Sequence, residues 1–303
     1  MGEVIYCLCR LGGKMNIGIV GGGAIGLLVG SYLGNEHDIT LYVRRDAQLT
    51  EIEEHNIQLQ VNGEQRSEVE VEVKNISRIS DHDCLFICVK QPQLKHVLPF
   101  LQHLKHDTPI VFLQNGMGHI EVAKQLNQAS YLGVVEHGAS KLNDYTVNHL
   151  GIGKIVLGSH TGDQVQLTKI KQAINQKDFP FEQSDEVTLL LKEKLIVNAV
   201  INPLTALFNV ANGDIIENKH IKILAKKVCQ EVANTLKLDE AASWRRVKTI
   251  AHNTRNNTSS MRADVLAKRE TEIESIIGYV IEQGKEKLPY TTFIYHSILA
   301  KSY

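Results

Sequence analysis

The chain has 303 residues and a formal net charge of −1, with 43% hydrophobic and 22% charged residues. This length suffices for about two domains of ordinary size, and the composition is typical of a soluble globular protein. The near-neutral charge offers no strong electrostatic field for nucleic acid or an anionic membrane surface. No apolar stretch reaches the roughly 18 to 20 residues that a membrane span requires. We therefore expect neither a nucleic-acid-binding protein nor a membrane protein.

The first predicted strand begins only after residue 14. Residues 1–14 contain one short apolar run but no cationic segment and no small-residue cleavage site, so they are a poor match to a signal peptide. The residues Gly12-Gly13-Lys14 before Met15 are what a purine-rich ribosome-binding site would encode if it were translated. Our hypothesis is that translation starts at Met15 and that residues 1–14 are a disordered or untranslated extension. The intact mass of the native protein tests this, because a mass that includes these residues would contradict it.

A glycine-rich loop follows the predicted strand at residues 17–20. Glycines at its first, third and sixth positions match the G-x-G-x-x-G pattern of dinucleotide-binding loops. In this pattern Gly21 allows a tight turn, Gly23 lets the backbone approach a pyrophosphate, and Gly26 lets the next helix pack closely on the strand. The helix N-terminus adds unpaired N–H groups and partial positive charge, which stabilise a phosphate. We expect this loop to bind a dinucleotide rather than to form only a structural turn, through Gly21, Gly22, Gly23, Ala24, Ile25 and Gly26.

The residues that follow the second predicted strand indicate which dinucleotide is bound. A helix at residues 25–33 leads to a β-branched strand at residues 38–43, which runs into Arg44 and Arg45. An NAD-binding domain usually has Asp or Glu here to bind the ribose hydroxyls, whereas arginine suits a 2′-phosphate. We therefore predict NADP (NADPH) as the cofactor, with Arg44 as a ligand. Asp46 as a ribose ligand and solvated arginines are the alternatives, and a flavin is less favoured for the same reason.

Further elements of the first half alternate between strands and helices. A helix is predicted at residues 47–55, and a hairpin at residues 57–61 and 69–73, because Asn62-Gly63 is a strong hairpin signal. Parallel strands are predicted at residues 85–89 and 109–113, and further strands at residues 131–135, 146–149 and 154–157. This half therefore has the pattern of a Rossmann-type α/β domain.

The cysteines and histidines indicate a reducing, cytoplasmic setting without a metal site. Cys84 and Cys88 lie in one predicted strand, where four residues span about 13 Å, too far for a disulfide. The 13 histidines show no spacing typical of zinc ligands, so we predict no metal. Five cysteines in a chain of this length do not suggest a disulfide framework.

From residue 186 onward nearly every segment has helical periodicity. One apolar face, for example, consists of Ile273, Ile276, Ile277, Val280 and Ile281. The predicted fold class is thus α/β, with an NADP-binding Rossmann-type domain at residues 15–185 and an all-helical substrate and catalytic domain at residues 186–303. We expect a substrate to meet the nicotinamide in a cleft between two such domains.

One predicted helix of the second half carries polar residues on an otherwise apolar sequence. Lys194, Asn198 and Asn202 are spaced four apart and so share one face. Such groups require polar partners, although a solvated stripe is the alternative. Pro203 cannot donate to the carbonyl of Ala199 and is expected to kink the helix.

Several motifs in chain order together resemble the ketopantoate reductase (2-dehydropantoate 2-reductase) family. They are the glycine loop, Arg44, Gln-Asn-Gly-Met-Gly at residues 114–118, the run at residues 194–203, and residues 257–261 with 271–273. The resemblance extends from Met15 almost to the C-terminus. It implies a cytoplasmic enzyme that reduces 2-dehydropantoate to (R)-pantoate with NADPH, a step in pantothenate and coenzyme A synthesis.

The resemblance also implies roles for individual residues. Lys194 would be the general acid, because an ammonium beside the ketone oxygen stabilises its developing charge and delivers the proton. Glu272 would be the partner of Lys194. The remaining implied roles are binding of the substrate hydroxyl by Asn198 and Asn202, binding of its carboxylate by Ser260, contact with the nicotinamide and the substrate by Asn115, and contact with the cofactor by Lys90.

Each of these residues also has a structural interpretation. Ser260 could cap the next helix, Asn115 could belong to a simple turn, Glu272 could favour a helix dipole, and Lys90 could be a surface lysine. Two other functions stay open: a reductase of another branched 2-oxo acid, and a non-catalytic dinucleotide sensor, which would need no proton donor. The expected partner is a small 2-oxo acid, and the sequence does not indicate an oligomer.

Overall fold

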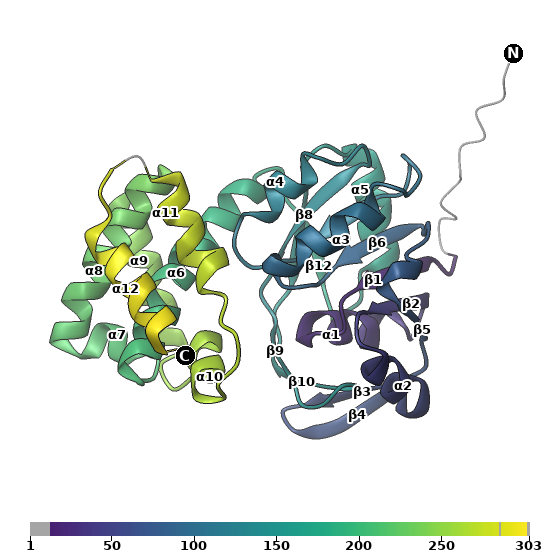
Figure 1. The fold of residues 1–303 in the computed structure, drawn as a ribbon, viewed down its shortest axis with the longest axis horizontal. Coiled ribbons are helices and arrows are strands. Elements are labelled where there is room, and N and C mark those ends of the chain that lie inside the picture. The colour runs from purple at the N-terminus through teal and green to yellow at the C-terminus, as the bar shows by residue number, and fades with distance from the viewer. Residues whose placement is uncertain (1–12, 285, 302–303) are drawn as a thin grey trace, which may run out of the picture. The chain divides into compact units, whose positions relative to one another are not determined.

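The computed structural model describes residues 13–284 and 286–301, which form two compact units (Figure 1). Unit 1 holds residues 13–114 and 119–187, and unit 2 holds residues 115–118 together with the described residues from 188 onward. Most of the N-terminal extension, residues 1–12, lies outside the described residues, so the hypothesis of a start at Met15 stays a prediction.

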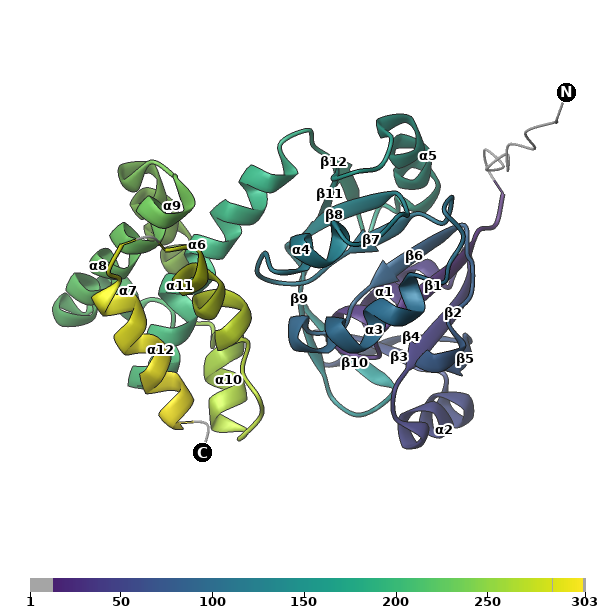
Figure 2. The same ribbon diagram turned by 45° about the horizontal axis from the view of Figure 1, so that its top comes forward.

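A mostly parallel sheet of eight strands is the framework of unit 1, and its strands lie side by side in Figure 2. The strand order is β5–β2–β1–β6–β7–β8–β11–β12, and only the β8–β11 pair is antiparallel. The strands are β1 Asn16–Val20, β2 Asp38–Val43, β5 Glu72–Asn75, β6 Cys84–Ile87, β7 Ile110–Phe112, β8 Ser130–Val135, β11 Ile155–Ser159 and β12 Phe181–Gln183. Because β1 lies between β2 and β6, the order reverses at β1, and ligands of open α/β sheets bind at such a point.

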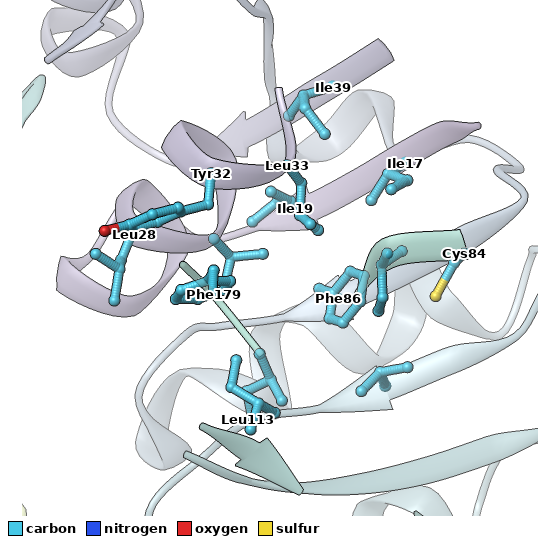
Figure 3. Packing of buried hydrophobic residues seen from close by; sticks show 14 of the residues in the cluster. Ile17, Ile19, Leu28, Tyr32, Leu33, Ile39, Cys84, Phe86, Leu113 and Phe179 are labelled. Atoms are coloured by element: carbon cyan, nitrogen blue, oxygen red, sulfur yellow. The ribbon is translucent and has the colours of Figure 1, made fainter. Parts of the chain in front are cut away.

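The helices of unit 1 bury their apolar faces against this framework. They are α1 Ala24–Leu33, α2 Asp46–His55, α3 Leu94–Leu101, α4 His119–Ala123 and α5 Gln164–Ile174, with short helices η1 Ile76–Arg78 and η2 Gln91–Gln93. In Figure 3 side chains of α1, such as Leu33, face those of β1, such as Ile19, and both side chains are fully buried. Burial of such side chains stabilises the unit by about 1.5 to 3 kcal/mol each.

A second sheet of four strands packs against α1. Its order is β4–β3–β10–β9, with β3 Ile57–Val61, β4 Glu64–Val69, β9 Gly138–Lys141 and β10 Thr146–Gly151. The predicted hairpin is confirmed, since Asn62 and Gly63 have φ of 51° and 89°, as a tight hairpin turn requires. The predicted second strand at residues 69–73 is wrong. The second strand of the hairpin is β4, which starts at Glu64, and Val73 belongs to β5. The prediction failed because β4 is an exposed polar edge strand, whose sequence has no alternation of apolar residues.

Unit 2 is helical, which confirms the predicted fold class. Its helices are α6 Val187–Phe208, α7 Asp214–Glu217, α8 Lys219–Leu236, α9 Glu240–Asn253, α10 Ser260–Leu266, η3 Glu274–Gly278, α11 Tyr279–Gln283 and α12 Pro289–Lys301. Helix α8 packs against α7, α9, α11 and α12. The predicted apolar face at Ile273, Ile276, Ile277 and Val280 is buried, but η3 within it is a π-helix rather than an α-helix. In the part of the chain that the structure describes, no helix combines the length and apolarity needed to span a membrane.

Candidate functional site

The glycine loop lies directly after β1, at the point where the strand order reverses. Gly21 has a φ of +113°, and its N–H donates to the carbonyl oxygen of Tyr42 in β2 at 2.8 Å. A Cβ atom on Gly21 would lie 2.9 Å from the Val89 nitrogen, and one on Gly26 would lie only 1.8 Å from the Gly21 carbonyl oxygen. Both positions therefore require glycine, for the turn and for close packing of α1 respectively.

The beginning of α1 is open for an anion. Gly23 is the N-cap of α1, and a Cβ added there would meet nothing within 4 Å among the described residues. No side chain in the described chain caps this helix, and its first turn contains no acidic residue. The first N–H groups of a helix attract phosphate through hydrogen bonds and the helix dipole. The residues at this loop thus fit the pyrophosphate of a dinucleotide.

The end of β2 presents one exposed arginine to such a ligand. The side chain of Arg44 makes no hydrogen bond or ion pair within residues 13–284 and 286–301. In contrast, Arg45 pairs with Asp144, and Asp46 accepts a hydrogen bond from Asn75 Nδ2 at 3.0 Å. Lys90 is exposed just beyond β6. Arg44 is therefore better placed than Asp46 to receive a ligand, although its role and that of Lys90 stay predictions.

Helix α6 carries the predicted polar face of unit 2. It continues through Pro203 to Phe208 as one helix. Lys194, Asn198 and Asn202 are half-buried along it, and the residues between them are mostly apolar and buried. An ammonium group and two carboxamides are thereby held at a partly desolvated surface, where hydrogen bonds and charge interactions with a small polar ligand are stronger than in open water.

A hydrogen bond joins two predicted site residues that are far apart in sequence. Asn115 Nδ2 donates to Glu272 Oε2 at 3.1 Å, across 157 residues of chain, and both side chains are half-buried. Asn115 does lie in a turn, since Gly116 has a φ of +81°, but the contact shows that within unit 2 this turn also directs the amide to Glu272. Glu272 lies just before the π-helix η3, a type of helix frequent at functional sites. The predicted pairing of Glu272 with Lys194 stays a prediction.

The cap of α10 is Ser259 rather than Ser260. The Ser259 hydroxyl accepts a hydrogen bond from the Arg262 N–H at 3.2 Å and lies 2.7 Å from the hydroxyl of Thr205 in α6. The interpretation of Ser260 as a helix cap is therefore wrong. Ser260 is the first residue of α10 and is exposed, so its hydroxyl is accessible to a ligand.

Two glutamines near the glycine loop had no predicted role. Gln114 is 5% exposed, and its Nε2 donates to the carbonyl oxygens of Ile87 at 2.9 Å and Val89 at 3.2 Å, which fixes the chain beyond β6. Gln48 donates to the Gly22 carbonyl oxygen at 2.7 Å. Gln114 directly follows a predicted strand, and this position could have indicated its role. The predicted helix that contains Gln48 offered no such signal.

Comparison with known proteins covers almost the whole chain. Residues 17–162 match the family model described as ketopantoate reductase PanE/ApbA, and residues 186–302 match the model of its C-terminal part. The 2-dehydropantoate 2-reductase of Bacillus subtilis (strain 168) is 40% identical over 94% of this chain and 97% of its own length. That of Listeria monocytogenes serovar 1/2a is 33% identical, over 94% and 96%.

Solved structures give the same picture of the fold. A probable 2-dehydropantoate 2-reductase from Bacillus subtilis has a TM-score of 0.87 and 38% identity, over 94% of this chain and 99% of that one. A D-mandelate dehydrogenase with NADH and anilino(oxo)acetate has a TM-score of 0.86 and 24% identity, over 95% and 98%, and shares the fold.

Proposed function

The chain belongs to the ketopantoate reductase family, and we propose that it reduces 2-dehydropantoate to (R)-pantoate with NADPH. The observation that carries the proposal is the half-buried polar face of α6, formed by Lys194, Asn198 and Asn202. A protein that only binds a dinucleotide does not need an ammonium group there. The proposal includes a cytoplasmic location, a place in pantothenate synthesis, and a small 2-oxo acid as the partner.

The cofactor is held by unit 1 in this proposal. The first N–H groups of α1, from Gly23 onward, bind the pyrophosphate, Arg44 binds the 2′-phosphate, and Lys90 makes a further contact. Asn115 contributes near the nicotinamide. The open space at Gly23 and the exposed guanidinium of Arg44 support this assignment. When bound, NADPH supplies a hydride to the carbonyl carbon of the substrate.

The proton comes from Lys194. As the substrate carbonyl is reduced, its oxygen gains negative charge, which the Lys194 ammonium stabilises before it transfers a proton and becomes a neutral amine. Solvent then returns the proton to the amine. Asn198 and Asn202 bind the hydroxyl group of the substrate, and the Ser260 hydroxyl donates to the substrate carboxylate.

Glu272 positions the acid in this mechanism. A carboxylate close to an ammonium favours its protonated form, which is the form that a proton donor needs before each turnover. The amide of Asn115 donates to Glu272 at 3.1 Å and so restrains the direction of the carboxylate. Glu272→Gln should therefore lower kcat and move the alkaline limb of its pH profile, where Lys194 loses its proton, to lower pH. A purely structural role would instead lower thermal stability and leave the profile unchanged.

NADPH consumption with a series of 2-oxo acids tests the function. We expect kcat/KM to be highest for 2-dehydropantoate. A higher value for another branched 2-oxo acid would make the chain a reductase of that acid instead, and tight NADPH binding without turnover of any of them would indicate a sensor. Equal kcat/KM with NADH and NADPH would contradict the assignment of Arg44.

A further inference from the structure

The turn between β9 and β10 of unit 1 lies close to the glycine loop and to the end of β2. The turn between β9 and β10 carries Asp144, whose Oδ1 accepts hydrogen bonds from the Arg45 guanidinium and from Lys141 Nζ, the latter at 2.7 Å. Gln48 Nε2 lies 2.7 Å from the Gly22 carbonyl oxygen and 2.9 Å from that of Asp144. This turn is thus joined to the glycine loop by Gln48 and to the end of β2 by Arg45.

The positive charges around the turn between β9 and β10 outnumber the negative ones. Arg45 and Lys141 both pair with the carboxylate of Asp144, and Arg44, which has no ion pair among the described residues, immediately precedes Arg45. With Asp46 counted as well, these residues comprise three cations and two carboxylates. Burial alone would raise the pKa of Asp144, but the hydrogen bonds from Lys141 and Arg45 lower it, so the carboxylate is ionised at neutral pH. The cluster therefore keeps a net positive charge.

The two ion pairs of Asp144 are not explained by a contribution to folding stability. The Arg45 side chain is 52% exposed, so its ion pair with Asp144 adds little to folding. Lys141 and Asp144 are 27% and 25% exposed, so solvent also reaches their ion pair. The carbonyl oxygen of Asp144, through Gln48, already fastens the turn without them. These charged side chains lie at a ligand site and are not needed to hold the fold. Such an arrangement indicates recognition of a charged group of the ligand.

We propose that Asp144 is a specificity-determining residue that moderates the preference of the cofactor site for a 2′-phosphate, by competing with the phosphate for the neighbouring cations. This inference rests on the proposed binding of a dinucleotide at the glycine loop. A 2′-phosphate carries up to two negative charges and several acceptor oxygens, so it competes with Asp144 for Arg45 and Lys141, whereas a 2′-hydroxyl does not. Asp144 keeps both cations directed to this end of the site, and its own negative charge limits how tightly the phosphate binds.

Binding of adenosine 2′,5′-bisphosphate and of ADP to the full-length protein, measured by calorimetry at low salt, tests the proposal. Asp144→Asn should strengthen binding of the bisphosphate by roughly three- to tenfold, because one repulsive charge is removed, and change ADP binding by less than about twofold. Lys141→Met and Arg45→Met should weaken the bisphosphate selectively by a similar factor. Each effect should shrink as salt is added.

A matched control is Glu121→Gln, which removes an exposed carboxylate of α4 that pairs with Lys124 at 2.7 Å. This variant should leave both affinities unchanged. If the Asp144 and Lys141 variants alter both ligands equally, or alter only thermal stability, the cluster is a structural clamp and the proposal is wrong. Turnover of 2-dehydropantoate is measured separately on the unaltered protein, so a selective shift without turnover would retain this inference while the proposed function failed.

Discussion

The candidate site of unit 1 is built from backbone, whereas that of unit 2 is built from side chains. In unit 1 the positive φ of Gly21 and the missing side chains at Gly23 and Gly26 shape the loop. In unit 2 the proposed chemistry depends on the Lys194 side chain and on a hydrogen bond between the side chains of Asn115 and Glu272. A backbone site is encoded by local spacing, but a side-chain site forms only after distant segments pack.

The polar side chains singled out in the two units also differ in burial. Unit 1 buries several histidines in hydrogen-bonded positions, among them His137 and His149, where they serve the fold. Unit 2 leaves Lys194, Asn198 and Asn202 half-buried along α6, where they can still receive a ligand. The difference teaches that burial with internal partners marks a structural polar group, and that partial exposure on an apolar face marks a group available for chemistry.

The largest effect is expected from the side-chain site. Lys194→Ala should lower kcat by roughly 100- to 10,000-fold, because it removes the proton donor. Affinity for NADPH, measured by fluorescence titration, should stay within about twofold, since a distal acid adds little uniform binding. Lys192→Ala is the matched control, two residues earlier on the same helix and also half-buried. Near-normal turnover of the Lys194 variant would break the comparison, because the α6 face would then be structural.

The next largest effect tests the backbone site through its own glycines. Gly26→Ala should destabilise the protein by about 3 kcal/mol or more in urea unfolding, because its Cβ would collide with the Gly21 carbonyl oxygen. Gly23→Ala should change stability by less than about 1 kcal/mol, since the site is open, and yet weaken NADPH binding. Unchanged NADPH affinity of Gly23→Ala would show that the pyrophosphate does not lie at this helix terminus.

The sequence indicated the elements of unit 1 well wherever apolar runs were bounded by turns. The predicted strands that became β1, β2, β6, β7 and β8 agree with the structure to within about two residues, which is the usual uncertainty of strand ends. The polar strand β4 was placed too late, and β9 and β12 were not predicted, because short or exposed strands carry little periodicity.

The candidate site was predictable as a set of residue types but not as an arrangement. The spacing of Lys194, Asn198 and Asn202 predicted a shared helix face, which the structure confirms. No local pattern predicts that Asn115 meets Glu272, because tertiary packing alone brings them together across 157 residues. The same holds for the contact between Arg45 and Asp144, which depends on how the turn between β9 and β10 is held against Gln48 of α2.

A smaller effect, confined to acid pH, tests whether the buried histidines of unit 1 are structural. The Gly153 N–H donates to His137 Nδ1 at 3.1 Å, so this nitrogen must be unprotonated. Burial, with a smaller contribution from His149, lowers the pKa of His137 from 6.5 to about 4. Because the folded pKa is below the unfolded one, this stabilisation is complete above pH 6.5 and decreases as the pH falls toward about 4.

Urea midpoints at pH 7.5 and pH 5 measure this, with His137→Phe as the variant that cannot titrate and can still stack on Phe179. The decrease in midpoint between the two pH values should be smaller in His137→Phe than in the unaltered protein, whatever its absolute stability. His106→Gln changes an exposed histidine and should keep the full decrease. Identical decreases in all three proteins would mean that His137 does not couple folding to pH.

The smallest effect separates structure from function at two adjacent serines of unit 2. Ser259→Ala should lower stability by about 1 kcal/mol, since it removes the cap of α10 and the contact with Thr205. Ser260→Ala should leave the urea midpoint unchanged and raise KM for 2-dehydropantoate by roughly three- to tenfold, because one hydrogen bond to the carboxylate is lost. If Ser260→Ala instead lowers the midpoint and keeps KM, its exposed hydroxyl serves the fold, and the substrate carboxylate must be bound by another residue of unit 2.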